Sequence, residues 1–141
     1  MPSPKARILC TEDNTDTREL LTVLLQVAGY DVVCTDNAKE ALMLAKSQPF
    51  DLYLVDGWLP DTSGLSLTEW IREFDKTTPI LFYSGAAYDS DLRNALKAGA
   101  SGYLVKPAEN EKLLSEIGRL IESSKSSSLT LPLGQLFDLT L

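Results

Sequence analysis

The sequence contains no histidine and only two cysteines, and both shortages exclude classes of chemistry. Without histidine, the chain cannot carry a Ser-His-Asp or Cys-His catalytic set or a zinc site with imidazole ligands. Cys10 and Cys34 each lie within an apolar run, where a free cysteine commonly behaves as a small buried hydrophobic residue. We therefore expect two free thiols, with neither a disulfide nor a metal site, in a cytoplasmic protein.

Long apolar runs and an excess of positive charge are also lacking. No stretch of about 18 apolar residues is present, so we expect no membrane span, and the first residues do not resemble a signal peptide. The formal net charge of −7 argues against DNA binding, which requires clustered Lys and Arg. The 141 residues are enough for one domain with a hydrophobic core.

Five apolar runs alternate with five segments of helical period. The predicted strands cover residues 6–10, 30–35, 51–55, 79–83 and 102–105. The first helical segment has apolar residues at helical spacing in Leu20, Leu21, Leu24 and Ala28 before Gly29. The second follows a capping pair of Asn37 and Glu40 and has Ala41, Leu42, Leu44 and Ala45. The third covers residues 65–74, the fourth has Leu92, Ala95 and Leu96 before Gly99, and the fifth covers about 109–122. Buried strands that alternate with helices are typical of a parallel sheet covered on both faces. We predict the α/β class and a doubly wound, flavodoxin-like sheet of order 2-1-3-4-5.

The composition changes after Ser123. We assign residues 1–123 to one domain and 124–141 to a Ser-rich linker and a short apolar tail, too short for an output domain. The simplest expectation for the tail is disorder. As alternatives, it adds a strand to a sheet edge or packs against another subunit.

Polar residues follow each of the five predicted strands; Asp36 and Asn37 follow the second, which lies to the far side of the first. Glu12 and Asp13 follow the first strand, Asp56 the third, Ser84 the fourth and Lys106 the fifth. In an open α/β sheet, ligands bind beyond the carboxyl ends of the strands where the strand order reverses. Each residue alone has an ordinary explanation as a turn former or a helix-terminal charge. Their joint placement at one edge predicts a functional site.

The residue types in this predicted site suggest phosphoryl chemistry. Three carboxylates in one place repel one another unless a cation neutralises them, and oxygen ligands suit Mg²⁺ or Mn²⁺. A carboxylate beside such an ion can attack phosphorus to form an aspartyl phosphate. The Lys106 ammonium and the Ser84 hydroxyl would then stabilise the phosphoryl oxygens.

These residues stand in motifs that resemble the receiver domain of two-component response regulators, over about residues 5–123. The motifs are Glu12-Asp13, Asp51-Leu-Tyr-Leu-Val-Asp56-Gly-Trp-Leu-Pro60-Asp-Thr-Ser-Gly64, Ser84-Gly-Ala and Ala98-Gly-Ala-Ser-Gly-Tyr103-Leu-Val-Lys106-Pro107. The resemblance also supports the strand order given above.

The resemblance implies a role for each residue of the site. Asp56 is the implied phosphoacceptor, and Asp13, with Glu12 acting through water, is the implied metal site, completed by the main-chain carbonyl of Trp58. Lys106 would pair with the phosphoryl group, and its bond to Pro107 would be cis.

The resemblance further implies a switch and its partners. Ser84 would move toward the phosphoryl group and Tyr103 would follow it inward, unless Tyr103 is simply a half-buried aromatic at the sheet edge. The change would alter a surface made of the helix that ends at Gly99, the strand 102–105 and the helix 109–122.

The chain would be a signalling module, not an enzyme in its own right. The implied phosphodonor is a histidine kinase or a histidine phosphotransfer protein, and the output goes to a protein target. If the domain forms a dimer, the implied contact is the surface changed by the switch or the tail.

Two departures from the family pattern concern the site itself. Glu12 stands where relatives more often have Asp, which keeps the charge on a longer side chain. Trp58 is bulky where many relatives have a smaller or polar residue, and its ring could shield the phosphoryl group from water. We therefore expect slow self-dephosphorylation.

Three competing functions fit the sequence less well. A phosphatase of the haloacid dehalogenase class would need a second Asp two residues after Asp56, where the chain has Trp58. A flavodoxin-like cofactor binder lacks its phosphate loop, because Glu12 and Asp13 would repel a phosphate. A degenerate receiver would lack Asp13, Asp56 or Lys106, and all three are present.

Overall fold

The structure is a computed structural model that describes residues 5–129. Its strands are β1 (Arg7–Thr11), β2 (Asp31–Thr35), β3 (Leu52–Val55), β4 (Ile80–Ser84) and β5 (Gly102–Val105). Its helices are α1 (Thr15–Val27), α2 (Ala38–Ser47), α3 (Gly64–Arg72), α4 (Asp89–Ala98) and α5 (Asn110–Leu129). The strands begin and end within one residue of the predicted positions. The expectations for the tail fall on residues 130–141, outside the described residues.

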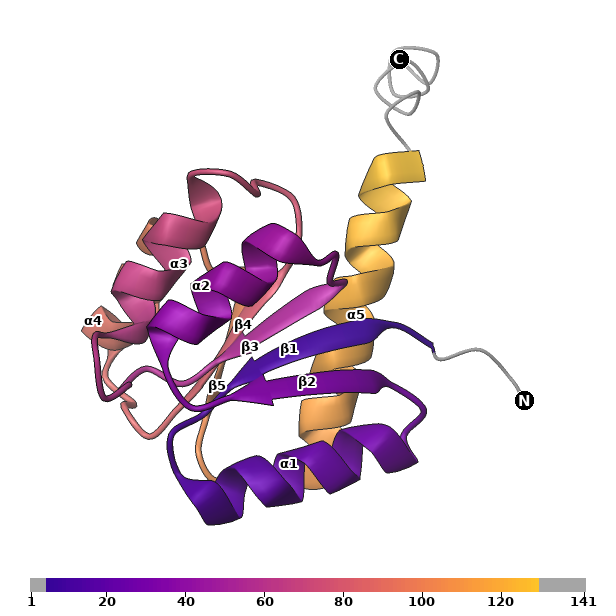
Figure 1. Cartoon of the computed structure of the whole chain (residues 1–141), viewed down its shortest axis with the longest axis horizontal. Helices are drawn as coiled ribbons and strands as arrows, with labels where there is room; N and C mark the ends of the chain where they lie inside the picture. Colours follow the sequence, from indigo (N-terminus) through magenta and orange to yellow (C-terminus); the bar gives the residue numbers. More distant parts are fainter. Residues whose placement is uncertain (1–4, 130–141) are drawn as a thin grey trace.

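The five strands form one sheet of order β2-β1-β3-β4-β5, and all four neighbouring pairs are parallel. This confirms the predicted doubly wound α/β fold. The order reverses between β1 and β3, so the chain leaves these neighbouring strands toward opposite faces of the sheet. Figure 1 shows the resulting layers, with α1 and α5 on one face and α2, α3 and α4 on the other.

Two hydrophobic clusters hold the helices against the sheet, one on each face. The first joins Ile8 and Leu54 of the sheet to Leu25 of α1 and Ile117 of α5. The second joins Leu9, Tyr53, Val55, Ile80 and Phe82 of the sheet to Ala41 of α2, Leu67 and Ile71 of α3 and Ala95 of α4. Because consecutive strand residues point to opposite faces, near-continuous apolar strands such as β3 supply both clusters.

Polar side chains fix where several helices begin. Asn14, Asn37 and Ser63 each accept a hydrogen bond from a backbone N–H in the first turn of α1, α2 and α3. For α2 the donor is Glu40 N, which confirms the predicted capping position. Gly29 and Gly99 follow α1 and α4 with φ of 100° and 121°, a conformation that glycine adopts without steric cost.

The predicted end of the last helix is wrong. We expected an end near Glu122 and a Ser-rich linker from residue 124, but α5 continues to Leu129. Serine lowers helix propensity only moderately, and no Pro or Gly occurs between Glu122 and Leu129 to end the helix.

Not all of the apolar residues that recur at helical spacing are buried. Leu20 of α1 and Leu92 and Leu96 of α4 lie at the surface, while Leu21 and Ala95 are buried. The helical period is the same for adjacent stripes of a helix, so spacing alone did not show which leucines face the sheet.

Both cysteines are free, as predicted, with Cys10 buried and Cys34 half-buried. Among the described residues, no helix is both long and apolar enough to cross a membrane.

Candidate functional site

The three predicted carboxylates meet at the carboxyl edge of the sheet. Glu12 and Asp13 follow β1, Asp56 follows β3, and one carboxylate oxygen from each lies within 4.8 Å of the others. Glu12 and Asp56 are buried, with exposed fractions of 2% and 7%, whereas Asp13 is exposed. A cluster of oxygen ligands with one face open to solvent suits a hard divalent cation that keeps part of its water shell. The residues present therefore fit Mg²⁺.

Lys106 brings the positive charge to this cluster from the end of β5. Its Nζ donates to Glu12 Oε1 at 2.5 Å and lies 3.5 Å from Asp56 Oδ2. The bond from Lys106 to Pro107 is cis, as the resemblance implied. Residues that are far apart in the sequence thus form one ionic group, with Lys106 closer to Glu12 than to Asp56.

The protonation equilibria reflect this crowding. Burial raises the pKa of Asp56 to about 6, the neighbouring Glu12 adds to the rise, and Lys106 and the Trp58 backbone N–H oppose it. Burial tends to lower the pKa of Lys106, but the hydrogen bond to Glu12 and the charge of Asp56 raise it overall. Near neutral pH the site therefore holds a carboxylate at Asp56 and an ammonium at Lys106.

Ser84 ends β4 beside the residue that follows Asp56. A Cβ atom placed on Gly57 would lie 2.6 Å from Ser84 Oγ, so only glycine allows the β3–α3 loop to approach this close. The Ser84 side chain is buried, and its Oγ accepts a hydrogen bond from Ala86 N at 3.3 Å. The hydroxyl is therefore held next to the loop that carries Asp56.

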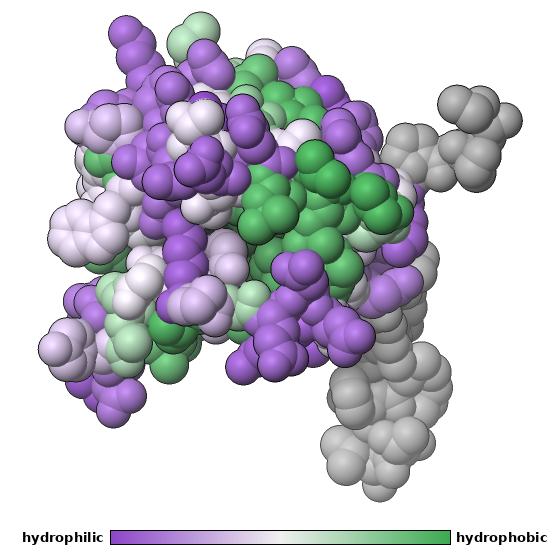
Figure 2. Space-filling view, turned by 90° about the horizontal axis from the view of Figure 1, so that it is seen from below, coloured by the Kyte–Doolittle hydropathy of each residue, from purple (hydrophilic) through white to green (hydrophobic). Residues whose placement is uncertain are grey.

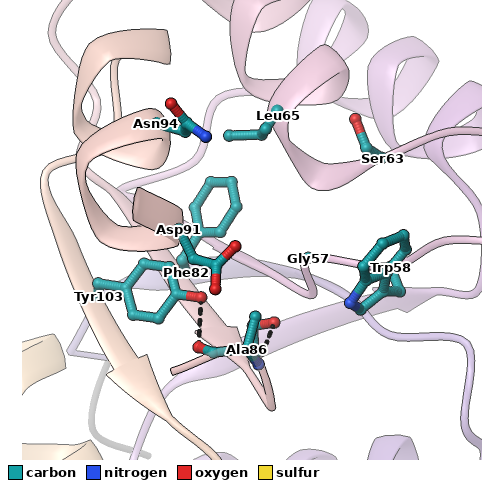
Figure 3. Close-up of a pocket in the computed structure, with 10 residues that line it drawn as sticks. Gly57, Trp58, Ser63, Leu65, Phe82, Ala86, Asp91, Asn94 and Tyr103 are labelled. Atoms are coloured by element: carbon teal, nitrogen blue, oxygen red, sulfur yellow. Dashed lines mark hydrogen bonds between the residues drawn. The ribbon is translucent and has the colours of Figure 1, made fainter. Parts of the chain in front are cut away.

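Tyr103 of β5 and Ser84 line the same cavity. Its ring is stacked on Phe82 with centroids 5.7 Å apart, and its hydroxyl donates to the Ala86 carbonyl at 2.7 Å. The cavity has a volume of about 130 Å³ and extends from Tyr103 past Asp91 to Gly57 and Trp58 (Figure 3). Tyr103 is thus half-buried and already contacts the β4–α4 loop.

Trp58 lies at the opposite end of this cavity from Tyr103 (Figure 3). Trp58 is 72% exposed, and its backbone N–H donates to Asp56 Oδ1 at 3.3 Å. The loop therefore fixes the Trp58 backbone against Asp56 and leaves the indole free at the surface.

Two contributors to the site had no role in the sequence argument. Arg18 of α1 donates from Nη1 to the backbone carbonyls of Glu12 and Asp13 at 2.9 and 3.3 Å, which holds the β1–α1 loop in place. Asp61 of the β3–α3 loop accepts from the backbone N–H groups of Ala38 and Lys39 at 2.9 Å each. The only signal for Asp61 was its place beside Pro60 in a loop motif, and Arg18 gave none.

Comparison with known proteins agrees with this geometry. Residues 8–118 match the family model of the response regulator receiver domain. A probable transcriptional regulatory protein of Picosynechococcus is 34% identical over 126 residues, which cover 84% of this chain and 50% of that protein. The chain spans about half the length of the curated relatives that head this comparison.

Solved structures show the same fold. A CheY-like receiver domain protein from Methanospirillum hungatei is 27% identical with a TM-score of 0.83, over 89% of this chain and 99% of that one. The receiver domain of a sensor histidine kinase from Pseudomonas aeruginosa is 31% identical with a TM-score of 0.78, over 83% of this chain and 98% of that one. That structure has a magnesium ion coordinated in its active-site cleft.

A doubly wound sheet with an acidic cluster and a lysine at its switch point defines the class of phosphoacceptor signalling domains. The chain belongs to the receiver domain family of two-component response regulators.

Proposed function

We propose that Asp56 accepts the phosphoryl group in this receiver domain. The observation that carries the proposal is the convergence of Asp56, Lys106 and two further carboxylates within one partly buried group at the switch point. Asp56 is buried, yet one face of the cluster is open where Asp13 meets solvent. A phosphodonor can therefore approach the cluster from that side.

Asp56, Lys106 and Ser84 would each have a separate role in the phosphoryl transfer. The Asp56 carboxylate attacks phosphorus, and the bond to the donor breaks as the new bond to oxygen forms. Lys106 exchanges its bond to Glu12 for one to a phosphoryl oxygen, and the Ser84 hydroxyl donates to another. The chain thus assists its own phosphorylation and dephosphorylation while acting as a signalling module.

Mg²⁺, or Mn²⁺ in its place, is the cofactor that the carboxylates of this site would hold. Asp13 and Asp56 would bind it directly, Glu12 would act through water, and the Trp58 carbonyl would complete the set. The bound ion would neutralise the carboxylates and the phosphoryl oxygens. With the ion bound, the Glu12 carboxylate would no longer need the Lys106 ammonium as its counter-charge.

The phosphodonor partner is a histidine kinase or a histidine phosphotransfer protein, and its docking surface is the exposed side of α1. Figure 2 views the molecule from the side of α1 and shows an apolar patch there; Leu20, Val23 and Val27 of α1 are exposed. Their spacing forms one stripe along the helix, and α1 begins beside Asp13. A partner on this stripe would bring its phosphohistidine to the open side of the site.

A second exposed surface is the proposed output. Tyr88 and the α4 residues Leu92 and Leu96 recur at helical spacing and are exposed, as is Val105 of β5. Through Ala86, Tyr103 connects this surface to Ser84. This α4-β5-α5 surface would bind a downstream protein or a second copy of the domain, and not DNA.

Tryptophan fluorescence tests the proposed site. In a Trp70→Phe background, which leaves Trp58 as the only tryptophan, adding Mg²⁺ and then beryllofluoride as a phosphoryl mimic should change the emission. The change should disappear in Asp56→Asn. No response in the parent background would contradict the proposal, and an equal response in Asp56→Asn would move the site elsewhere.

A further inference from the structure

The two cysteines are direct neighbours across β1 and β2. Cys10 and Cys34 pair in the strand register, and both belong to the hydrophobic cluster beneath α1 and α5. Neighbouring strands lie about 4.8 Å apart. That spacing lies within the Cα separation of about 4.4–6.8 Å found in disulfides. Two free thiols with the same facing direction are therefore placed where a covalent bond between them can form.

The surroundings of Cys34 favour its thiolate. Cys34 lies on β2, an edge strand of the sheet, and is half-buried, so small reagents can reach it. Its Sγ lies 2.9 Å from Thr22 Oγ1. The neighbouring Cys10 thiol, the Thr22 hydroxyl and the charge of Arg18 lower the pKa of Cys34 to about 6 against the opposing effect of burial. Cys10, by contrast, is fully buried.

The Thr22 hydroxyl has two acceptors within reach. It donates to the backbone carbonyl of Arg18 at 2.8 Å, a carbonyl that also lies in the helical hydrogen-bond ladder. When Cys34 ionises, the hydroxyl can turn to the sulfur at little cost. Thr22 thus stabilises the more reactive form of Cys34.

We propose that Cys10 and Cys34 form a redox-sensitive dithiol that a hydroperoxide converts into an intramolecular disulfide. The Cys34 thiolate attacks the outer peroxide oxygen and the O–O bond breaks, so that Cys34 becomes a sulfenic acid while the leaving oxygen takes up a proton from solvent and departs as an alcohol or water. The Cys10 sulfur then attacks the Cys34 sulfur, the S–O bond breaks, and water leaves with the Cys10 proton. Two thiols lose two electrons, and one peroxide gains them.

The disulfide would lie two residues before the acidic pair of the phosphorylation site, so its effect on that site rests on the proposed function. The backbone pairing continues from Cys10 and Cys34 to Glu12, whose N–H donates to the Thr35 carbonyl at 3.0 Å. Because a disulfide usually holds its Cα atoms about 5.5–6 Å apart, the bond would shift β1 relative to β2 and move Glu12 and Asp13 out of their positions beside Asp56 on β3. Oxidation would therefore weaken Mg²⁺ binding.

The covalent step can be tested without phosphorylation. The folded chain, treated with hydrogen peroxide, should lose the mass of two hydrogens, and peptide mapping without reductant should join Cys10 to Cys34. Dithiothreitol should reverse the change. In Cys10→Ser, a cyclic diketone that traps sulfenic acids should label Cys34. A parent chain that keeps its mass, or that forms only dimers between chains, would overturn the proposal.

Thr22→Val separates chemistry from packing, because valine keeps the shape and removes the hydroxyl. This variant should fold and react with peroxide several-fold more slowly. An unchanged rate would show that Thr22 does not activate Cys34.

Mg²⁺ titration of the reduced and oxidised chains tests the coupling. We expect binding to weaken several-fold on oxidation and to recover with dithiothreitol. Equal affinities would overturn the coupling, while an absence of Mg²⁺ binding in the reduced chain would instead overturn the proposed function.

Discussion

The environment of the Asp56 side chain lowers the stability of the folded chain when that side chain is ionised. Its pKa is raised to about 6, so the folded chain binds a proton at Asp56 more readily than the unfolded chain, whose value is near 3.8. Above the folded pKa the ionised Asp56 therefore destabilises the fold, and this penalty disappears as the pH falls toward 4. Such a cost is common for carboxylates in functional sites.

Asp56→Asn should accordingly stabilise the chain near neutral pH without Mg²⁺. We expect the free energy of unfolding to rise by about 1–2 kcal/mol, since one pKa unit corresponds to about 1.4 kcal/mol and solvent screens part of the effect. Urea denaturation with and without Mg²⁺ measures this, and Mg²⁺ should stabilise the parent more than the variant. Glu122→Gln, an exposed change on α5, is the control. A less stable Asp56→Asn would contradict the account of the carboxylate cluster.

Trp58 carries the prediction about phosphoryl lifetime. Its backbone is tied to Asp56 and its bulky ring is free at the surface, where it can cross the path of an attacking water molecule. Trp58→Asn should shorten the lifetime several-fold, measured as the decay of the phosphorylated mass after the donor is removed. Trp70→Asn is the matched control, since Trp70 lies on α3. An unchanged lifetime in Trp58→Asn would show that the indole ring does not shield the phosphoryl group from water.

Among the elements, α2 depends on a residue outside its own sequence. Although desolvation acts in the other direction, the N–H groups of Ala38 and Lys39 hold the pKa of the exposed Asp61 below its usual range. The Asp61 carboxylate therefore supplements the local cap, Asn37, and ties the β3–α3 loop to α2.

Asp61→Ala should cost about 1 kcal/mol of stability, the usual cost of losing a helix cap. Because the pKa of Asp61 is lowered in the fold, its contribution is present above the unfolded value of 3.8 and is lost as the pH falls below it. Urea denaturation near neutral pH and near pH 3 checks both parts. Asp61→Asn, which keeps one acceptor oxygen, should lose less. A loss that persists unchanged at the lower pH would point to packing instead.

Sequence patterns predicted the elements better than the contacts between them. The strand ends followed from apolar runs, and the parallel order then placed Glu12, Asp56 and Lys106 at one edge. The preference of Lys106 for Glu12 over Asp56 did not follow, because it depends on the positions of two loops to within a few tenths of an ångström. The link from Asp61 to α2 was missed for the same reason.

For the molecule as a whole, the residues of both hydrophobic clusters within the part of the chain that the structure describes lie between Ala6 and Ile121. This packing predicts that residues 5–129 fold without residues 130–141. A chain ending at Leu129 should unfold within about 0.5 kcal/mol of the parent, as expected for changes away from packed features. Urea denaturation of the two chains measures this, and a larger loss would assign the tail a structural contact with the domain.

The domain as a whole is proposed to convert one charge change at Asp56 into a change of surface, so phosphoryl transfer to Asp56 is the step on which everything else depends. The direct measurement is the mass of the chain after incubation with Mg²⁺ and a small acyl phosphate, followed by peptide mapping of the modified residue. We predict the addition of one phosphoryl group at Asp56, abolished by Asp56→Asn and by removal of Mg²⁺. A chain that gains no phosphoryl group, or gains it at another residue, would contradict the proposed function.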